Sequence, residues 1–459
     1  MMREPAFSLL TPPRALSLKG KRVLVLGLGD TGLSVARWVQ RHGGIVRAAD
    51  TRKIPPRKGD YAGELQTGKF KPALLQDVDL VCVSPGLPLT ESVVLEAMKR
   101  NVPIVGDIEL FAWEVRRKSR CKVLAITGTN GKSTVTALTG HLLRSAGIDA
   151  EVAGNISPPA LDALAKRAKA PATWVLELSS YQLETTWSLA PEAAAMLNLS
   201  EDHLDRYAGL ARYAAAKARV FQGSGVQVLN RCDASSMSMA LPERAQVTFG
   251  MDAPPMAEDF GLRDEWLVRG EERILKAGEL RIAGAHNVSN ALAACALAHQ
   301  AGAPLRMLAA GLRSFGGLPH RMERVAERKG VVWLDDSKGT NVGATVAALR
   351  GLDRKAVLIL GGEGKGQDFS PLAPAVKACA KQVILIGRDA ALIRRALSAT
   401  GIPAEKAKTM QEAVKRAAEL ARPGEAVLLS PACASFDMFR DYKHRGEAFA
   451  AAVGELGDG

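Results

Sequence analysis

The sequence has no apolar run of about 18 or more residues, so it predicts no membrane-spanning helix. It is also poor in cysteine. The six cysteines are far apart and form no Cys-x-x-Cys pair, which fits neither a disulfide framework nor a zinc site. Residues 1–18 carry an early arginine, an acid at Glu4 and prolines at Pro12 and Pro13, a composition that does not predict a signal peptide. These absences together predict a cytoplasmic protein.

Aromatic residues are few as well, at 5%, although the formal net charge is +13. The lysines and arginines are dispersed apart from one dense cluster at residues 116–122, and no aromatic residue is interleaved with that cluster. A stacking platform for nucleic acid is therefore not expected. A basic enzyme that handles polyanionic nucleotides explains the charge more simply, so we expect small-molecule substrates and no nucleic-acid partner.

A chain of 459 residues predicts about three domains. Short apolar runs alternate with helical patterns, and a strand leads into a glycine-rich loop three times, at residues 27, 128 and 361. This pattern predicts an α/β protein with a Rossmann-like N-terminal domain, a central P-loop-type ATPase domain and a doubly wound, Rossmann-like C-terminal domain. We place these domains at residues 1–112, 113–317 and 318–459, with a strand-rich, irregular excursion at 235–283.

The N-terminal domain opens with one βαβ unit. A strand at 21–26 leads into Gly27-Leu28-Gly29-Asp30-Thr31-Gly32, a helix follows through Gln40, and a strand at 45–49 ends in Asp50. This is the full Gly-x-Gly-x-x-Gly fingerprint, with an acid about twenty residues on where a ribose-binding carboxylate would sit. Taken alone, it indicates an NAD-dependent dehydrogenase.

The central domain carries a phosphate loop. A strand at 123–126 leads into Gly128-Thr129-Asn130-Gly131-Lys132-Ser133-Thr134, and a helical pattern follows at 135–144. The N–H groups of such a turn point at phosphate, the lysine adds charge, and Ser or Thr can bind Mg²⁺. The standard pattern asks for a glycine at the position of Ile126, so this loop is shorter than usual. We interpret it as an ATP site rather than a glycine turn with a surface lysine.

Acids and a histidine follow two further predicted strands. Glu177 comes after the strand at 173–176, and Glu201-Asp202-His203 comes shortly after the strand at 193–197. The carboxyl ends of these strands lie next to the phosphate loop, where an enzyme that uses Mg²⁺ and ATP needs such groups. Further strands predicted at 80–83, 102–105, 331–334, 357–360, 383–386 and 426–429 complete the sheets of the outer domains.

These motifs together resemble the Mur ligase family, and the resemblance covers roughly residues 20–456. Its later markers are Gly284-Ala285-His286-Asn287, Leu318-Pro319-His320-Arg321, Asp336-Ser337-Lys338 and Ser430-Pro431-Ala432-Cys433-Ala434-Ser435. The last motif and the Rossmann-like first domain resemble the members that add D-glutamate to UDP-N-acetylmuramoyl-L-alanine in peptidoglycan precursor synthesis. The resemblance implies that ATP phosphorylates a carboxylate and that the amine of D-glutamate then attacks the acyl phosphate. It also implies that the Rossmann-like domain holds UDP, which presents a pyrophosphate and a ribose as NAD does.

The resemblance assigns the catalytic and ATP-binding residues by position. Lys132, Glu177, His203 and Lys217 are implied to be catalytic. Two Mg²⁺ are implied, one held by Ser133 and Glu177, the other by His203 together with Lys217 if that lysine is carbamylated. The implied ATP-binding residues are Gly128, Thr129, Asn130, Gly131, Lys132, Ser133, Thr134, Asn290, Arg321 and Asp336.

The remaining implied residues bind the other two substrates. For the UDP-substrate they are Leu28, Gly29, Asp30, Thr31, Asp50, Thr51, Arg52, Asn155 and Ser179. For D-glutamate they are Lys338, Thr340, Lys365, Ser435 and Tyr442. Tyr442 stands where some relatives have Phe. Cys433 has no histidine beside it in the sequence, so we interpret it as a structural thiol.

Two other classes of function stay open at this stage. One is a different amide ligase of the same superfamily, which would add L-alanine, a diamino acid or a dipeptide, or extend folate with glutamate. The other is a nucleotide-binding protein without ligase activity, against which stands the full set of metal and phosphate residues. We expect the protein to be a monomer.

Overall fold

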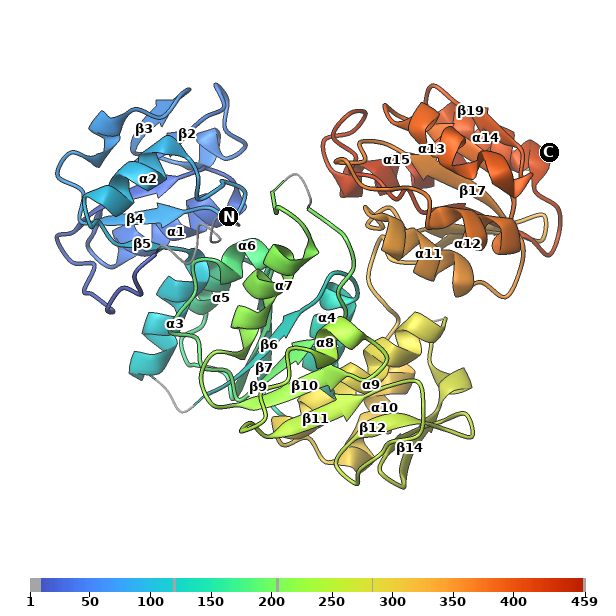
Figure 1. The fold of residues 1–459 in the computed structure, drawn as a ribbon, viewed down its shortest axis with the longest axis horizontal. Helices are drawn as coiled ribbons and strands as arrows, with labels where there is room; N and C mark the ends of the chain where they lie inside the picture. The colour runs from blue at the N-terminus through green and yellow to red at the C-terminus, as the bar shows by residue number, and fades with distance from the viewer. Residues whose placement is uncertain (1–9, 119–120, 204–205, 283, 457–459) are drawn as a thin grey trace.

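The computed structural model describes residues 10–118, 121–203, 206–282 and 284–456. Residues 1–9, which are part of the N-terminal segment considered above for a signal peptide, lie outside these ranges. Arg120 of the basic cluster does so too. Three sheets follow one another along the chain, and Figure 1 shows each in a separate lobe together with its helices. The predicted boundaries at 112/113 and 317/318 fall between these sheets.

The N-terminal sheet has five parallel strands in the order β3-β2-β1-β4-β5. Because β1 lies in the middle, the glycine-rich turn after it opens at the carboxyl edge of the sheet, where α/β folds bind nucleotides. The strands are β1 (Arg22–Leu26), β2 (Ile45–Asp50), β3 (Glu64–Thr67), β4 (Leu80–Val83) and β5 (Ile104–Val105). The helices are α1 (Asp30–Arg41), α2 (Ser92–Lys99) and α3 (Asp107–Lys118), which leads to the central domain.

The central sheet has nine strands, of which β7-β8-β6-β9-β10-β11-β12 are parallel and β12-β13-β14 are antiparallel. The strands are β6 (Lys122–Thr127), β7 (Ala150–Gly154), β8 (Thr173–Glu177), β9 (Ala193–Met196), β10 (Val226–Asn230), β11 (Gln246–Phe249), β12 (Phe260–Arg263), β13 (Trp266–Arg269) and β14 (Glu272–Lys276). The helices are α4 (Lys132–Ser145), α5 (Ala160–Lys166), α6 (Ser180–Leu183), α7 (Leu210–Ala218), α8 (Ala234–Met237), α9 (Ala285–Gln300) and α10 (Leu305–Ser314). The predicted excursion therefore extends the sheet through β11–β14.

The C-terminal sheet has six strands in the order β15-β16-β20-β17-β18-β19, and only β15 is antiparallel to its neighbour. The strands are β15 (Glu323–Arg328), β16 (Val331–Asp335), β17 (Ala356–Gly361), β18 (Ala380–Ile386), β19 (Ala404–Lys406) and β20 (Ala426–Leu429). The helices are α11 (Val342–Arg350), α12 (Leu372–Cys379), α13 (Ala390–Leu397), α14 (Met410–Leu420) and α15 (Tyr442–Gly454). The predicted fold class, α/β in three domains, is confirmed.

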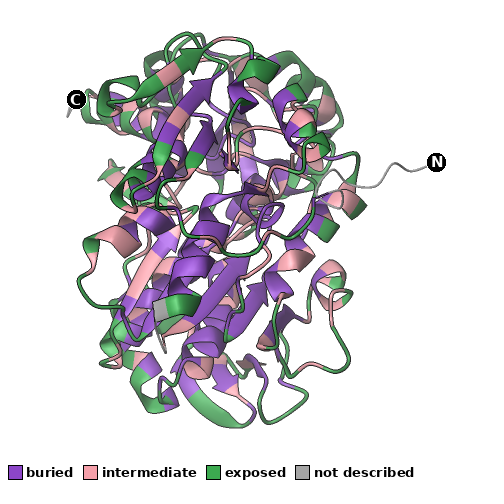
Figure 2. Cartoon of the chain, turned by 90° about the vertical axis from the view of Figure 1, so that its left-hand side faces the viewer, coloured by how far each residue is buried: buried purple, intermediate pink, exposed green. Residues whose placement is uncertain are grey.

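The hydrophobic cores show which domains are joined. One cluster of buried side chains runs from β1 and α1 of the N-terminal domain through Phe111 of α3 to Trp174 of the central domain. The C-terminal domain instead has two clusters of its own, one on each face of its sheet. Figure 2 shows the strands and the inner helix faces as the buried part of the molecule. The N-terminal and central domains therefore share a core that the C-terminal domain does not join.

Most predicted strands agree closely with the structure, because most are apolar runs that are buried on both faces. The strand predicted at 102–105 is shorter than expected, since β5 spans only Ile104–Val105. The strands predicted at 80–83 and 426–429 have those bounds in β4 and β20. The sequence reasoning did not find β3, β7, β10, β15 and β19. In β3, β15 and β19 every position is exposed or half-buried, so these strands show no apolar pattern.

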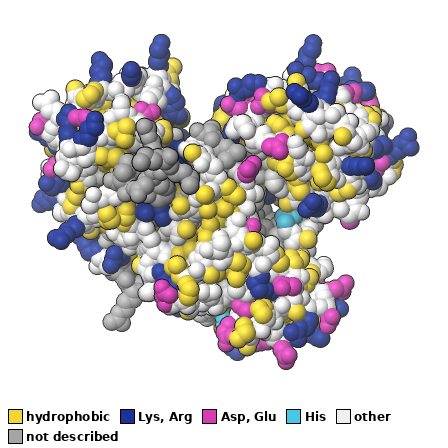
Figure 3. All heavy atoms as spheres, in the orientation of Figure 1, with side chains coloured by type: hydrophobic (Ala, Val, Ile, Leu, Met, Phe, Trp, Pro, Cys, Tyr) yellow, Lys and Arg dark blue, Asp and Glu magenta, His cyan; other side chains and the backbone are white. Residues whose placement is uncertain are grey.

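The surface agrees with the expectation of dispersed charge. Lys and Arg side chains are scattered over all three domains on the face that Figure 3 shows, and they do not gather into one patch there. Among the residues that the structure describes, no helix is long and apolar enough to cross a membrane. All six cysteines lie in the described residues, and none of them forms a disulfide bond.

Candidate active site

The phosphate loop folds around the side chain of Lys132. The lysine begins α4, is half-buried, and its Nζ donates to the carbonyl oxygens of Gly128 at 2.9 Å and Thr129 at 2.8 Å. Gly131 before it has φ +82°, and a Cβ there would lie 2.4 Å from Oδ1 of Asn290, so only glycine fits. Burial lowers the pKa of Lys132. The loop thus holds a cation at the N-terminus of a helix, as a phosphate site requires.

Glu177 stands at the end of β8, beside this loop, and is 1% exposed. Its Oε1 accepts a hydrogen bond from Nδ2 of Asn155 at 2.7 Å, whereas its Oε2 is buried with no hydrogen-bond partner. A buried carboxylate oxygen without a partner is unfavourable unless a cation satisfies it. A hard oxygen donor in this position fits Mg²⁺, which prefers carboxylate, hydroxyl and phosphate oxygens.

His203 lies on the loop after β9, with its Nε2 3.6 Å from Oδ2 of Asp202. Its ring lies 4.8 Å from that of Tyr181, centroid to centroid. Burial, together with Lys365, Lys132 and Lys217, lowers the pKa of His203 to about 4. The imidazole is therefore neutral at neutral pH, which is the form that can bind a metal ion.

Lys217 lies on α7 and is 1% exposed, although a lone lysine on a helix is usually solvated. Its Nζ donates to the carbonyl oxygen of Gly128 at 2.7 Å and to Oγ1 of Thr127 at 3.3 Å, and it lies 4.7 Å from the ring centroid of Tyr213. Burial, together with Lys132, lowers the pKa of Lys217 well below its ordinary value. The structure therefore places this lysine directly behind the phosphate loop.

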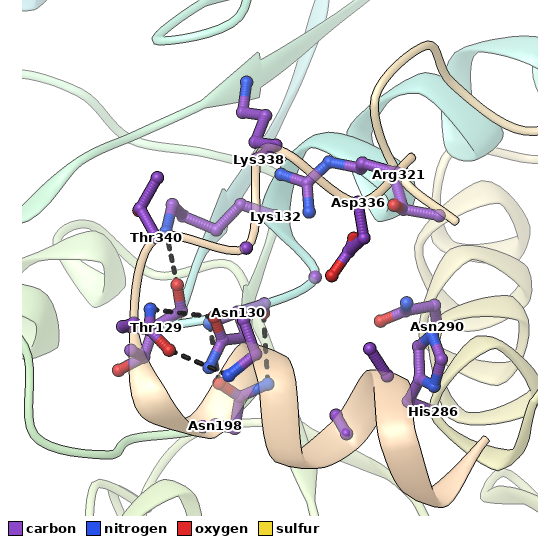
Figure 4. A pocket seen from close by; sticks show the side chains of 18 of the residues that line it. Thr129, Asn130, Lys132, Asn198, His286, Asn290, Arg321, Asp336, Lys338 and Thr340 are labelled. Carbon is purple, nitrogen blue, oxygen red and sulfur yellow. Dashed lines mark hydrogen bonds between the residues drawn. The ribbon is translucent and has the colours of Figure 1, made fainter. Parts of the chain in front are cut away.

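A cavity of about 470 Å³ lies between the central and C-terminal domains. Its two walls are already connected, because Nη2 of Arg321 donates to Oγ of Ser133 at 3.0 Å and Nδ2 of Asn341 donates to Oδ1 of Asn130 at 3.1 Å. Figure 4 shows Lys132, Arg321 and Lys338 on one side of the cavity and Asn290 at its far end. The predicted site residues that line it are Thr129, Asn130, Gly131, Lys132, Thr134, Asn155, Glu177, His203, Asn290, Arg321, Asp336, Lys338, Thr340 and Tyr442.

Five residues predicted for ATP, metal or D-glutamate do not line this cavity. Gly128 belongs to the phosphate loop, Ser133 lies in the first turn of α4, and Lys217 lies behind the loop and donates to the carbonyl oxygen of Gly128. Lys365 and Ser435 follow β17 and β20 of the C-terminal sheet and lie outside the lining. The structure therefore brings three of the five residues predicted for D-glutamate to the cavity.

Two of those three contact each other. Nζ of Lys338 donates to the hydroxyl of Tyr442 at 3.1 Å and lies 4.6 Å from the centroid of its ring. Burial, together with Arg321, lowers the pKa of Lys338 to about 8. Burial raises the pKa of the neighbouring Asp336 to about 7, although Oγ of Ser430 donates to its carboxylate at 2.7 Å. This corner of the cavity is rich in cationic groups, which suits an anionic ligand.

A second cavity, of about 550 Å³, lies between the N-terminal and central domains. It opens at the glycine-rich turn after β1, and residues 84–87 and Gln182 form other parts of its wall. The predicted residues that line it are Gly29, Asp30, Thr31, Asp50, Thr51, Arg52 and Asn155. Ser179 is not among them: it caps α6, where its Oγ accepts from the backbone N–H of Gln182 at 3.2 Å.

The carboxylate of Asp50 is engaged by the protein itself. Its Oδ2 accepts from the backbone N–H of Leu28 at 2.7 Å and from Nη2 of Arg52 at 2.6 Å, and its Oδ1 accepts from Nε of Arg52 at 2.8 Å. Asp50 therefore ties the glycine-rich turn to the loop after β2. Leu28 is fully buried outside the cavity lining, and its N–H already has this partner.

Asn155 lines both cavities. Its hydrogen bond to Glu177, which also interacts with Lys132, places the buried carboxylate and this lysine beside the wall that the cavities share. Two anionic substrates that entered from opposite sides would therefore meet beside a cation and a carboxylate able to hold a metal ion. This arrangement is suited to transfer of a phosphoryl group between them.

Sequence reasoning missed three residues that shape the site. Oδ1 of Asn198 accepts from the N–H of Asn130 at 2.8 Å, so it braces the phosphate loop. Asn341 caps α11 and crosses to the central domain, and Gln182 lines the second cavity. Asn198 could have been predicted from its place directly after a predicted strand. Asn341 and Gln182 are single amide side chains in no such position, so the sequence pattern does not indicate them.

Three family models match successive parts of the chain. The model described as "Mur ligase MurD-like, N-terminal domain" matches residues 21–106, "Mur ligase middle domain" matches 126–298, and "Mur ligase, glutamate ligase domain" matches 320–433. Together they span all three sheets.

Similar proteins agree with these matches over nearly the whole chain. A protein of Nitrosospira multiformis named UDP-N-acetylmuramoylalanine–D-glutamate ligase is 54% identical, over 95% of this chain and 96% of its own. A protein of Thiobacillus denitrificans with the same name is 53% identical, over 96% and 98%. The crystal structure of the UDP-N-acetylmuramate-alanine ligase of Thermotoga maritima matches at a TM-score of 0.63 and 21% identity, over 95% of this chain and 100% of that one. At that identity the structural match shows a shared fold.

Proposed function

The chain belongs to the Mur ligase family, and from that premise we propose that it joins D-glutamate to UDP-N-acetylmuramoyl-L-alanine while ATP is converted to ADP and phosphate. The two relatives described above carry the corresponding name, are 54% and 53% identical, and match along almost their entire length. The observation that carries the proposal is that Asn155 lines both cavities and bonds to Glu177, whose other carboxylate oxygen has no partner. The ligase would act in peptidoglycan precursor synthesis, in the cytoplasm and as a monomer, since one chain supplies every residue invoked.

In the first step, an oxygen of the alanyl carboxylate attacks the γ-phosphorus of ATP. The new bond gives an acyl phosphate, the bond to the bridging oxygen breaks, and ADP leaves. The second cavity would hold the UDP part of the substrate at the turn after β1, and the first would hold ATP. Lys132 would move from the carbonyls of Gly128 and Thr129 to the phosphates and stabilise the charge of the transferring group.

In the second step, the neutral amine of D-glutamate attacks the acyl carbon. The amide bond forms, phosphate leaves, and the amine loses a proton. Lys338, Thr340 and Tyr442 line the first cavity and would hold the carboxylates of D-glutamate, because lysines and hydroxyls suit a dicarboxylate. Lys365 and Ser435, from the same domain, are proposed to hold D-glutamate together with them.

Domain closure would protect the intermediate. The acyl phosphate hydrolyses readily, so water must be excluded while D-glutamate reacts. The C-terminal domain has a core of its own and meets the central domain through polar contacts such as Arg321 to Ser133. A domain held in this way can move as a unit, and we propose that it does.

Mg²⁺ would be held by Ser133 and Glu177 at one position and by His203 at another. When bound, it would neutralise phosphate charge and orient the phosphoryl group for in-line transfer. The unpartnered Oε2 of Glu177 and the neutral imidazole of His203 support this assignment.

Lys217 is proposed to carry a carbamate. Carbamate formation needs a neutral amine and CO₂, and burial of Lys217 favours the neutral amine. We expect Lys217→Ala to lose most of its turnover, and acetate or another small carboxylate to restore part of it, because the cavity left by the side chain admits a substitute anion. The measurement is initial rate against acetate concentration, with chloride at equal ionic strength as control. Full activity of Lys217→Ala, or no rescue of an inactive variant, would contradict the carbamate.

The experiment that tests the proposed function is phosphate release from the purified protein with ATP, Mg²⁺ and UDP-N-acetylmuramoyl-L-alanine. D-glutamate, L-glutamate, L-alanine and diaminopimelate are then added one at a time. We expect release with D-glutamate alone. Release with another amino acid would move the protein to a different ligase of the same family. No release with any acceptor would favour a nucleotide-binding protein without ligase activity.

A further inference from the structure

Asp107 is a buried acid at the junction of the N-terminal and central domains that has no part in the mechanism above. It begins α3, directly after β5 of the N-terminal sheet, and is 1% exposed. Its Oδ2 accepts a hydrogen bond from Nε2 of Gln182 at 3.0 Å, and its Oδ1 is buried with no hydrogen-bond partner. In the first turn of α3 this carboxylate is favourable, because the helix N-terminus and the backbone N–H groups of Ile108 and Asp107 stabilise its charge. The contact that crosses the domain junction is its hydrogen bond to Gln182.

The partner of Asp107 belongs to the central domain and forms part of the second cavity. Gln182 lies on α6, is 2% exposed, and lines the same cavity as Asn155 and the turn after β1. Its Oε1 accepts from the backbone N–H of Ser179 at 3.1 Å and from Oγ of Ser179 at 3.2 Å. Both ends of the amide are therefore used, one on each side of the domain junction.

The chemistry of Asp107 fixes which way this amide points. An ionised carboxylate can only accept hydrogen bonds, so it requires the NH₂ end of Gln182 on its side. The carbonyl end is then left for Ser179, which offers two donors. Burial raises the pKa of Asp107 to about 6, so the carboxyl is still ionised at neutral pH. An aliphatic side chain in place of Asp107 would leave the NH₂ group buried without a partner.

We propose that Asp107 is a positioning residue for the nucleotide-sugar substrate: by holding the carboxamide of Gln182 across the domain junction, it sets the wall of the cavity that Gln182 and Asn155 share. The inference rests on the proposed function in one respect, namely that this cavity binds the UDP-linked substrate. It adds a residue that contacts neither substrate nor metal. It also links the orientation of the N-terminal domain to the central half of the cavity.

The first test separates positioning from a purely structural role. In Asp107→Ala we expect the KM for UDP-N-acetylmuramoyl-L-alanine to rise about tenfold, the size that one ordinary hydrogen bond gives. The kcat and the KM values for ATP and D-glutamate should stay within about twofold. Asp107→Asn keeps an acceptor oxygen and should recover most of the loss. Asp77→Ala, which removes an exposed acid of the same domain, is the matched control and should change none of these constants.

The second test keeps the proposal open to refutation if Asp107→Ala does not fold. Gln182→Glu sets one carboxylate against another and should raise the same KM by tenfold or more. When it is combined with Asp107→Asn, the hydrogen bond can form in the reverse direction, and most of that loss should be recovered. If the two effects simply add, Asp107 does not act through Gln182 and the proposal is wrong.

The remaining outcomes distinguish this inference from the proposed function. If the wild-type protein releases phosphate as expected but Asp107→Ala leaves the KM for the UDP-linked substrate unchanged, only the inference fails. It also fails if the variant lowers kcat and raises every KM together, or changes thermal stability alone. If the wild-type protein neither binds the nucleotide sugar in calorimetry nor releases phosphate with it, the proposed function fails and the inference fails with it.

Discussion

Replacing Lys132 with alanine should lower turnover by a factor on the order of 10³, which corresponds to about 4 kcal/mol of transition-state stabilisation. The ammonium group of Lys132 lies inside the phosphate loop, 2.8–2.9 Å from two loop carbonyl oxygens. Lys132 is also the first residue of α4, so this positive charge lies at the N-terminus of the helix. Phosphoryl transfer depends mainly on neutralising charge at the moving group, so loss of this cation affects the transition state more than binding. The KM for UDP-N-acetylmuramoyl-L-alanine should change by no more than a few-fold.

The measurement is steady-state phosphate release at saturating ATP and Mg²⁺. Lys166→Ala, which removes an exposed lysine at the end of α5, serves as the matched control and should keep full activity. Thermal unfolding of both variants checks that the loop still folds. If Lys132→Ala keeps turnover within a few-fold of the parent, Lys132 is not the cation of the reaction.

Replacing Glu177 with glutamine should also lower turnover by a factor on the order of 10³. The change is isosteric, and the glutamine carbonyl can still accept from Nδ2 of Asn155, so the local structure should persist. What is lost is the negative charge on the oxygen that has no partner in the protein. The effect should therefore depend on metal: the Mg²⁺ concentration for half-maximal activity should rise, because a neutral amide is a weaker ligand than a carboxylate.

Titration of activity with Mg²⁺ at fixed ATP measures both effects. Glu192→Gln removes an exposed acid just before β9 in the same domain, and it should leave the titration unchanged. Near-parental turnover of Glu177→Gln, or a large loss with no change in the Mg²⁺ requirement, would mean that Glu177 is not a metal ligand.

Local sequence patterns predicted the sheets well because the central strands are buried on both faces. The run that became β6 and the glycine-rich loop after it could be recognised together, since a strand, a turn and a helix start are all short-range features. The edge strands β3 and β19 were missed because they carry mostly exposed or half-buried side chains, and their pairing decides their conformation.

The same distinction between local and long-range features applies to the residues of the candidate site. Lys132 and Glu177 could be named from their place at the ends of strands, because a parallel sheet brings its carboxyl ends to one edge. Lys217 could not, since one lysine on an alanine-rich helix resembles a surface residue until α7 packs against the phosphate loop. Asp107 and Gln182 are 75 residues apart, and no local pattern joins them.

The sequence by itself determined the three α/β domains, the two nucleotide-type loops and the family, because each depends on the order of residues over a few turns of chain. Only the tertiary structure decided which charged groups are buried together. In the tertiary structure, Asp50 accepts hydrogen bonds from Arg52 and from the backbone N–H of Leu28. One carboxylate oxygen of Glu177 is buried without a hydrogen-bond partner, and Asn155 lines both cavities. Burial and partnership depend on contacts between residues far apart in the chain, and those contacts exist only when the domains are packed against one another.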